Sequence, residues 1–380
     1  MKIAIDTTAI PAHRTGAGNY IFNLVRTLTE VDRANQYYIF TQAMHAADFA
    51  TAQSNVHVIV LNHTNRPARM LWEQVTLPRY LKRLKIDVLH SPHYTMPLAK
   101  PTTSIVTFCD MTFFLIPDMH SRSKRLFFRT MMRLSARRAD HLIAISESTK
   151  QDMIRVLGLP ASRIKVTPLA AGPSYRPLPR STVERVCEAY DLEFGQYIAY
   201  VGVLEPRKNV PLLINAYAAI ATDFPDVPLV IAGKKGWMYD AIFNTVQQLG
   251  IQDRVRFLGY VPDDDLPALY NGARAFVYPS NYEGFGLPVL EAMQSGAVVI
   301  TTNVSSMPEV AGDGAMLIEP NDQAGLEVAL RRVLCDPQFS AELIERAARR
   351  ATQFSWDRCA RETLAVYQAV AQRKYRKERT

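Results

Sequence analysis

The 380-residue sequence contains few cysteines and no long uncharged apolar run. Its cysteines, Cys109, Cys187, Cys335 and Cys359, form no C-x-x-C pair, which argues against a disulfide framework and against a zinc site. No uncharged stretch of about 18 residues occurs, and Asp6 interrupts the first apolar segment before it reaches the length of a signal peptide. We therefore expect a cytoplasmic protein with reduced thiols.

The sequence also lacks a pattern typical of metal ligands. His90, His93, His120 and His141 do not have ligand spacing, so each is expected to be a loop or core histidine. The acidic run 263–265 directly precedes a predicted helix, where carboxylates cap free amides, and we assign it that role rather than metal binding. No metal and no other cofactor is expected.

Composition bounds the class of protein without choosing its function. A chain with 48% hydrophobic and 21% charged residues is globular, and its length predicts two domains. The net charge of +8 is compatible with nucleic acid, an anionic membrane surface or a phosphorylated small molecule as partner.

Short β-branched runs alternate with longer helical patterns along most of the chain, which is typical of parallel sheets covered by helices. We predict an N-terminal Rossmann-like acceptor lobe at 1–175, a proline-rich linker at 176–190 and a Rossmann-like donor lobe at 191–355, followed by a C-terminal helix and basic tail at 356–380. The predicted fold class is α/β, with two doubly wound parallel-sheet lobes facing a central cleft. Ligands bind at the carboxyl ends of strands in such sheets.

The string EGFGLPVLE places Glu283 and Glu291 around a glycine-rich turn that opens a helix. Gly286 allows a tight turn, and Pro288 suits the first helical turn. Free amides at the helix start favour a diphosphate. Glu291 is then placed to accept hydrogen bonds from a ribose diol and Glu283 to reach a sugar ring. The alternative is that both acids merely complement the helix dipole.

This string and the following SGAVVITTNVSSMPEVAGDGAMLIEP closely resemble the donor-site signature of retaining GT-B glycosyltransferases, specifically family 4. The similarity also covers GAGNYIFNL, ADHLIAISESTKQDM, VGVLEPRKN and FLGYVPDDDLPALY, and so runs nearly end to end. Within the family, EPRKN is typical of a branch with many mannosyltransferases acting on polysaccharides. The resemblance implies a GT-B fold and sugar transfer from a nucleotide-sugar donor.

The resemblance also implies roles at matching positions. Glu283 would hold the donor sugar, and Lys208 with Arg207 would neutralise the departing diphosphate, because fixed cations favour a transition state that builds charge there. The alternative for this basic pair is a solvated position at a helix start. The donor-binding residues that we expect are Gly16, Gly18, Gly202, Tyr260, Val261, Phe285, Gly286, Leu287 and Glu291.

Two positions depart from the family pattern. Many relatives have arginine after the glycine of the second lobe's first strand, where this chain has Val203. Relatives often read His-Asp where this chain has Cys109 and Asp110, which we take as acceptor-side or sugar contacts. Cysteine substitutes for that histidine if the histidine acts through its backbone carbonyl. The string GAGNYI lacks the third glycine of a dinucleotide fingerprint, so a nicotinamide site is not expected.

Residues 121–139 contain seven Arg or Lys and no acid, with apolar residues interleaved. A basic amphipathic helix of this kind can lie on an anionic membrane surface. The alternative is a surface helix that buries its apolar stripe in its own lobe.

Together these features indicate a retaining glycosyltransferase that moves a sugar, with mannose from GDP-mannose as the best assignment, onto a glycan or lipid-linked acceptor in polysaccharide synthesis. Transfer on one face of the sugar is expected because the sequence shows no second well-placed carboxylate that could act as the nucleophile of a double displacement. The alternatives are a GT-B phosphorylase or epimerase and a nucleotide-sugar-binding protein without turnover. No nucleic-acid partner is expected, and any membrane contact would be peripheral, at the inner face.

Overall fold

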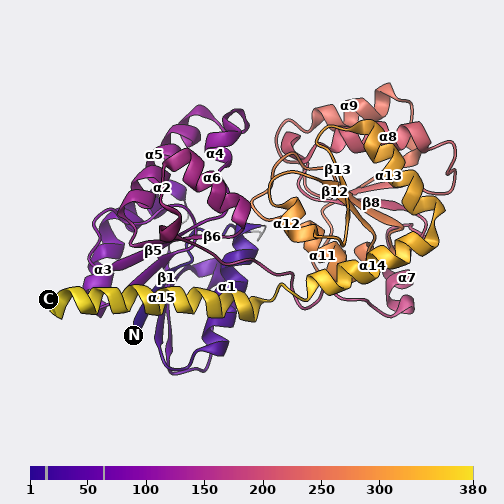
Figure 1. The fold of residues 1–380 in the computed structure, drawn as a ribbon. Coiled ribbons are helices and arrows are strands. Elements are labelled where there is room, and N and C mark those ends of the chain that lie inside the picture. The colour runs from indigo at the N-terminus through magenta and orange to yellow at the C-terminus, as the bar shows by residue number, and fades with distance from the viewer. Residues whose placement is uncertain (13–15, 63–64, 380) are drawn as a thin grey trace. The chain divides into compact units, whose positions relative to one another are not determined.

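The computed structural model describes residues 1–12, 16–62 and 65–379, which form two compact α/β units (Figure 1). The first unit comprises Met1–Leu169 together with the chain from Ser355 onward, and the second comprises Ala170–Phe354. Each unit has one parallel sheet with helices around it. The predicted fold class, two doubly wound Rossmann-like lobes, is confirmed.

The first unit contains a seven-stranded parallel sheet in the order β3-β2-β1-β4-β5-β6-β7. Its central strands are buried along their whole length, as expected for parallel strands covered on both faces. The strands are β1 (Lys2–Asp6), β2 (Gln36–Gln42), β3 (Val56–Leu61), β4 (Val88–Ser91), β5 (Thr103–Phe108), β6 (His141–Ala144) and β7 (Ile164–Val166).

The helices of the first unit include one π-helical turn, η3 (Trp72–Thr76), and a long C-terminal helix. The α-helices are α1 (Ala17–Val31), α2 (Arg66–Leu71), α3 (Leu77–Leu84), α4 (Thr112–Leu115), α5 (Arg122–Arg138), α6 (Glu147–Leu157) and α15 (Trp356–Arg379). Short 3-10 turns are η1 (Ala43–His45), η2 (Ala47–Phe49), η4 (Pro117–Met119) and η5 (Ala161–Arg163).

The second unit contains a six-stranded parallel sheet in the order β10-β9-β8-β11-β12-β13. The strands are β8 (Ile198–Val201), β9 (Leu229–Ala232), β10 (Val255–Gly259), β11 (Ala275–Tyr278), β12 (Val299–Thr302) and β13 (Met316–Ile318). The helices are α7 (Arg180–Glu188), α8 (Val210–Ile220), α9 (Asp240–Gln248), α10 (Leu266–Gly272), α11 (Leu287–Ser295), α12 (Met307–Ala311), α13 (Gln323–Cys335) and α14 (Pro337–Ala351), with 3-10 turns η6 (Pro206–Lys208) and η7 (Gln252–Arg254).

The segment 176–190, which the sequence predicts as a linker, contains α7 and belongs to the second unit. Helix α7 packs against α10. The chain just before α7 is held to α10 as well, because the Leu178 N–H donates to Asn271 Oδ1 at 3.0 Å.

The C-terminal helix α15 is part of the first unit's core. It packs along α1 and reaches β5 (Figure 1). Its Tyr367 hydroxyl lies 2.6 Å from His90 Nδ1, and His90 Nε2 lies 2.8 Å from the Thr107 hydroxyl. The Tyr20 hydroxyl lies 2.9 Å from the same Thr107 oxygen, and all four side chains are fully buried. Burial lowers the pKa of His90 to about 3, so a neutral imidazole joins α15 to the sheet.

Across the residues that the structure describes, no helix combines the length and the apolar character needed to span a bilayer.

Candidate active site

The second sheet reverses its strand order between β8 and β11. Ligands of open α/β sheets bind outside the carboxyl ends of the strands at such a reversal. The turn η6 follows β8, and a loop containing Ser280 and Glu283 follows β11. Two segments about 75 residues apart in sequence are therefore expected to meet at one edge of the sheet.

Hydrogen bonds hold the turn η6 directly against the loop after β11. The carbonyl of Arg207 accepts from the Asn281 N–H at 2.8 Å and from the Ser280 hydroxyl at 3.1 Å. The Arg207 guanidinium returns a bond to the carbonyl of Tyr282 at 2.9 Å. The backbone and side chain of Arg207 are thus fixed from both sides.

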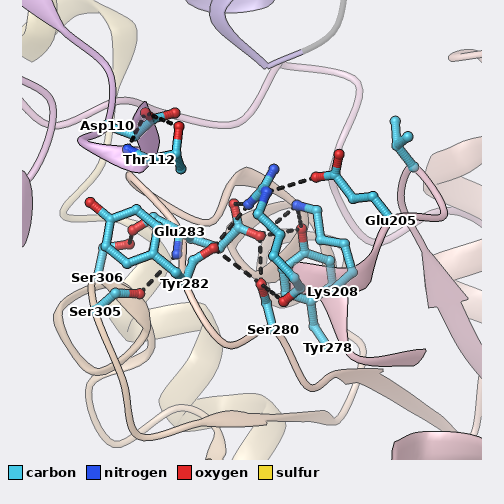
Figure 2. Close-up of polar contacts among 12 residues, drawn as sticks. Asp110, Thr112, Glu205, Lys208, Tyr278, Ser280, Tyr282, Glu283, Ser305 and Ser306 are labelled. Carbon is cyan, nitrogen blue, oxygen red and sulfur yellow. Dashed lines mark hydrogen bonds and ion pairs between the residues drawn. The ribbon is translucent and has the colours of Figure 1, made fainter. Parts of the chain in front are cut away.

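The carboxylate of Glu283 is the centre of the site, and donors engage both of its oxygens (Figure 2). Oε1 accepts from Lys208 Nζ at 2.5 Å, from the Ser280 hydroxyl at 2.8 Å and from the Tyr278 hydroxyl at 3.0 Å. Oε2 lies 2.7 Å from Arg207 Nη1. The structure therefore brings the three predicted catalytic residues, Glu283, Lys208 and Arg207, into direct contact.

Charge pairing decides the ionisation of this cluster. Burial opposes ionisation of Glu283, but Arg207 and Lys208 outweigh it and lower the pKa of the carboxyl to about 2. Burial also opposes the charge on Arg207, yet Glu283 and Glu205 raise its pKa well above the usual value. For Lys208 burial is the larger effect and lowers its pKa. Glu283 is consequently an anion at neutral pH, and its low basicity makes it a weak nucleophile.

Three further members of the cluster, Glu205, Tyr278 and Ser280, were not singled out from the sequence. Glu205 Oε1 lies 2.6 Å from Arg207 Nε, and the Tyr278 hydroxyl accepts a hydrogen bond from Lys208 Nζ. The string EPRKN contains Glu205, and the buried strand before the EGFGLP string contains Tyr278. These residues join the cluster because β8 and β11 are neighbouring strands. Neither EPRKN nor the strand before EGFGLP shows this pairing by itself.

The backbone at Glu283 is anchored by the loop after β12. The Glu283 N–H donates to the Ser305 hydroxyl at 2.9 Å, and its carbonyl accepts from the Ser306 hydroxyl at 3.0 Å (Figure 2). Gly286, the N-cap of α11, has φ of 101°, and a Cβ there would lie 2.2 Å from Met307 Cε. The expected glycine turn is confirmed, as is the proline in the first turn of α11.

Glu291 lies in α11 and forms a second, separate cluster with two tyrosines. The Tyr270 hydroxyl donates to Glu291 Oε2 at 3.3 Å, and Tyr175 also hydrogen-bonds to this carboxylate. Burial, with a smaller contribution from Asp263, raises the pKa of Glu291 to about 7 against the lowering effect of the tyrosines. Near neutral pH the carboxyl therefore exists in both protonation states.

The other predicted donor residues of the second unit occupy the ends of its strands. A Cβ at Gly202 would lie 2.9 Å from the Tyr200 hydroxyl, so this position after β8 is closely packed. Tyr260 follows β10 and is 56% exposed, with Lys234 Nζ 4.2 Å from its ring centroid. Val261 is buried.

The amides of Phe285, Gly286 and Leu287 are at the start of α11, where the first N–H groups have no intrahelical acceptor.

The remaining predicted residues, Gly16, Gly18, Cys109 and Asp110, belong to the first unit. Gly16 is the N-cap of α1 with φ of 35°, and Gly18 is buried in its first turn. Cys109 is buried, with Sγ 3.9 Å from the carbonyl of Pro92, and burial raises the pKa of its thiol. Asp110 Oδ1 accepts from the Thr112 N–H at 3.0 Å and from its hydroxyl at 2.8 Å (Figure 2).

The capping role predicted for the acidic run before α10 is wrong for Asp265. Asp265 is the N-cap residue, but its side chain makes no capping bond. Its backbone is already helical, with φ of −90° and ψ of −22°, whereas a capping side chain normally requires an extended residue. The carboxylate instead accepts from the Tyr190 hydroxyl at 2.7 Å. Within the described ranges, no group of three or more His, Cys, Asp or Glu could hold a metal ion.

Comparison with known proteins places both units in sugar-transferring families. The family model of glycosyl transferases group 1 matches residues 193–350, and that of Glycosyltransferase Family 4 matches residues 14–171. The O-antigen chain mannosyltransferase B of Escherichia coli is 32% identical, over 97% of this chain and 100% of that protein.

Solved structures show the same fold at lower identity. A sucrose-phosphate synthase from Thermosynechococcus elongatus superposes with a TM-score of 0.76 at 21% identity, over 97% of this chain and 99% of that one. The Anabaena protein HepE, in complex with UDP-glucose, gives a TM-score of 0.75 at 17% identity, over 97% and 100%. With the full-length relative, the two family matches and the two parallel sheets, the chain belongs to the GT-B glycosyltransferases of group 1, family 4.

Proposed function

We propose that this glycosyltransferase moves mannose from GDP-mannose onto a glycan or lipid-linked acceptor in polysaccharide synthesis, with retention of anomeric configuration. The observation that carries the proposal is the ion-pair cluster of Arg207, Lys208 and Glu283 at the strand-order reversal of the second sheet. The choice of mannose and of polysaccharide synthesis rests on the E. coli relative, an O-antigen chain mannosyltransferase. A nucleotide sugar as donor is also supported by the UDP-glucose complex of HepE.

Each group of the cluster fits one part of such a donor. Arg207 and Lys208 supply positive charge for the diphosphate, and the first amides of α11, at residues 285–287, supply aimed N–H groups. Glu283 accepts hydrogen bonds from the sugar hydroxyls, and Glu291 accepts from the ribose diol. Gly202, Tyr260 and Val261 lie at the strand ends where we expect the base, and Gly16 and Gly18 are the residues of the first unit that we expect to bind the phosphates.

The chemistry follows from the charges. The bond between the anomeric carbon and the phosphate oxygen breaks, and Arg207 and Lys208 stabilise the negative charge that develops on the leaving diphosphate. The acceptor oxygen bonds to the anomeric carbon on the same face, and its proton passes to the departing phosphate oxygen. Glu283 is unsuited to be a covalent nucleophile, because Arg207 and Lys208 lower the pKa of its carboxyl to about 2. Because two side-chain cations supply the charge, we propose that transfer requires no metal.

The acceptor contacts would come from the first unit, where Cys109 and Asp110 follow β5. The Cys109 side chain is buried, so this residue would act through its backbone. The Asp110 carboxylate is already bonded to Thr112 and would keep one oxygen for an acceptor or sugar hydroxyl.

The decisive experiment incubates the purified chain with a panel of nucleotide sugars and a mannose-terminated lipid-linked acceptor, with and without a chelator. We expect transfer from GDP-mannose, unaffected by the chelator, and a product whose new linkage has the α configuration of the donor by NMR. An inverted linkage contradicts retention. Donor binding without nucleoside diphosphate release would instead support a non-catalytic binding protein, and sugar phosphate formed with added inorganic phosphate would support a phosphorylase.

The raised pKa of Glu291 predicts that donor affinity depends on pH. A ribose diol donates to the ionised carboxylate, so binding favours loss of the proton. Affinity for GDP-mannose should therefore fall as the pH drops below about 7, by up to about tenfold per unit. Calorimetric titration between pH 5.5 and 8.5 measures this. Glu291→Gln should bind more weakly at high pH and lose the dependence, and a variant that keeps the wild-type profile would contradict the ribose role.

We also propose that α5 makes peripheral contact with anionic lipid at the inner membrane face. Leu126 is 72% exposed beside Arg122, Lys124 and other basic residues, while Met132 packs into the first unit. The helix thus buries only part of its apolar residues in its own unit. In liposome flotation we expect the protein to rise with anionic vesicles and not with neutral ones, and Leu126→Glu to weaken that association. Recovery in the soluble fraction with both lipids would contradict the contact.

A further inference from the structure

The cluster that contains Glu283 has as many side-chain cations as carboxylates. Arg207 and Lys208 carry positive charge, and Glu283 and Glu205 carry negative charge. A site that binds a diphosphate would be expected to carry excess positive charge, because each carboxylate beside the cations weakens their hold on an anion. Glu283 has the sugar contact as its proposed role, whereas Glu205 has none.

Glu205 contacts the cluster through Arg207. Its Oε1 lies 2.6 Å from Arg207 Nε, and its side chain is 17% exposed. The position of Arg207 does not depend on this contact alone, since Nη1 is held by Glu283 at 2.7 Å and by the carbonyl of Tyr282 at 2.9 Å. The Arg207 carbonyl is fixed separately by Asn281 and Ser280. The main contribution of Glu205 is therefore its charge.

We propose that Glu205 lowers the affinity of the site for nucleoside diphosphate and so promotes product release. This inference rests on the proposed function. The nucleoside diphosphate that remains after transfer carries more negative charge than the nucleotide sugar. A site built only from Arg207, Lys208 and helix amides would hold this product more tightly than the donor. The carboxylate on Arg207 reduces that excess without touching the sugar.

The effect can be bounded by electrostatics. At a separation of about 8 Å and an effective dielectric constant of about 20, removing one unit charge changes a binding constant by more than tenfold. Because Glu205 is partly exposed to solvent, screening reduces this effect, and we expect a change of about tenfold.

Glu205→Gln tests the inference, because glutamine keeps an oxygen that can accept from Arg207 Nε and removes only the charge. We expect the dissociation constant for GDP, measured by calorimetry at pH 8 and low salt, to fall about tenfold, and the product-inhibition constant to fall with it. The KM for GDP-mannose should fall less, and kcat should decrease if release limits turnover. The difference from wild type should shrink in high salt.

Two further variants serve as controls. Glu193→Gln removes the same charge from an exposed position of the second unit and should leave GDP affinity unchanged. Glu205→Asp keeps the charge and should bind GDP as the wild type does. Loss of GDP binding in both Glu205 variants would mean that the side chain is needed to place Arg207, and would overturn the inference.

The outcomes separate this inference from the proposed function. If the wild type binds GDP and transfers mannose but folded Glu205→Gln binds GDP equally or more weakly, the inference fails and the proposed function stands. If the wild type binds neither GDP nor any other nucleoside diphosphate, both fail. Thermal unfolding of each variant establishes that the compared proteins are folded.

Discussion

Glu283→Gln should lower the rate of sugar transfer about 100-fold to 1,000-fold while nucleoside diphosphate still binds. The glutamine amide replaces a carboxylate that accepts from Lys208, Tyr278 and Ser280 on a single oxygen. The variant therefore lacks the negative charge near the developing positive charge of the sugar ring. It also accepts weaker hydrogen bonds from the sugar hydroxyls than the carboxylate does. Initial rates of mannose transfer, with calorimetry for GDP, measure the two effects separately.

Glu283→Gln should also lower the free energy of unfolding. Removing one partner of a buried ion pair costs about 3–5 kcal/mol, and Glu283 pairs with two cations. Chemical denaturation should therefore be measured beside activity. Glu283→Asp retains the charge and provides a better-folded comparison, and it should still lose most activity because the shorter side chain moves the carboxylate away from its donors. Near-normal transfer by either folded variant would refute the role of Glu283.

Lys208→Met should lower transfer by a similar factor, about 100-fold to 1,000-fold, and should also weaken GDP binding. Lys208 is only 6% exposed, and its ammonium lies 2.5 Å from Glu283. Methionine fills much of the same volume without charge, so the leaving diphosphate loses one of its two cations. The loss of GDP affinity distinguishes this variant from Glu283→Gln, in which affinity is retained or increased.

Lys208→Arg is the matched control for charge. The guanidinium preserves the positive charge but is larger, planar and oriented differently, and the site around Lys208 is closely filled by Tyr278 and Glu283. We expect it to restore part of the GDP affinity and little of the transfer rate. Transfer by Lys208→Met within a few-fold of wild type would show that Arg207 alone neutralises the diphosphate.

The features that depend on local sequence could be predicted. The alternation of strands and helices follows from hydrophobic periodicity, and the turn before α11 follows from Gly286 and Pro288, whose backbone preferences are intrinsic. Glu283, Lys208 and Arg207 could be selected because their strings resemble a known signature. The signature did not predict that Arg207 and Lys208 form ion pairs directly with Glu283.

The features that depend on strand order and side-chain register could not be predicted. Glu205 and Tyr278 join the cluster because β8 and β11 are neighbours, although the two segments are far apart in sequence. Tyr175 hydrogen-bonds to Glu291, although the boundary predicted from the sequence assigns residue 175 to the N-terminal lobe. Capping by Asp265 failed as a prediction because the backbone at that residue is helical, and sequence does not report this.

The place where the last helix docks has a consequence for biosynthesis. The second unit is one uninterrupted stretch, 170–354, whereas the first unit lacks α15 until residues 356–379 have been synthesised. On the ribosome, the second unit can therefore fold while the nascent first unit still exposes the surface that α15 will cover. His90 meets its hydroxyl partner, Tyr367, only after 277 further residues have been synthesised. The domain that is made first is thus completed last, and a chain that stopped at residue 355 would carry a complete second unit beside an incomplete first one.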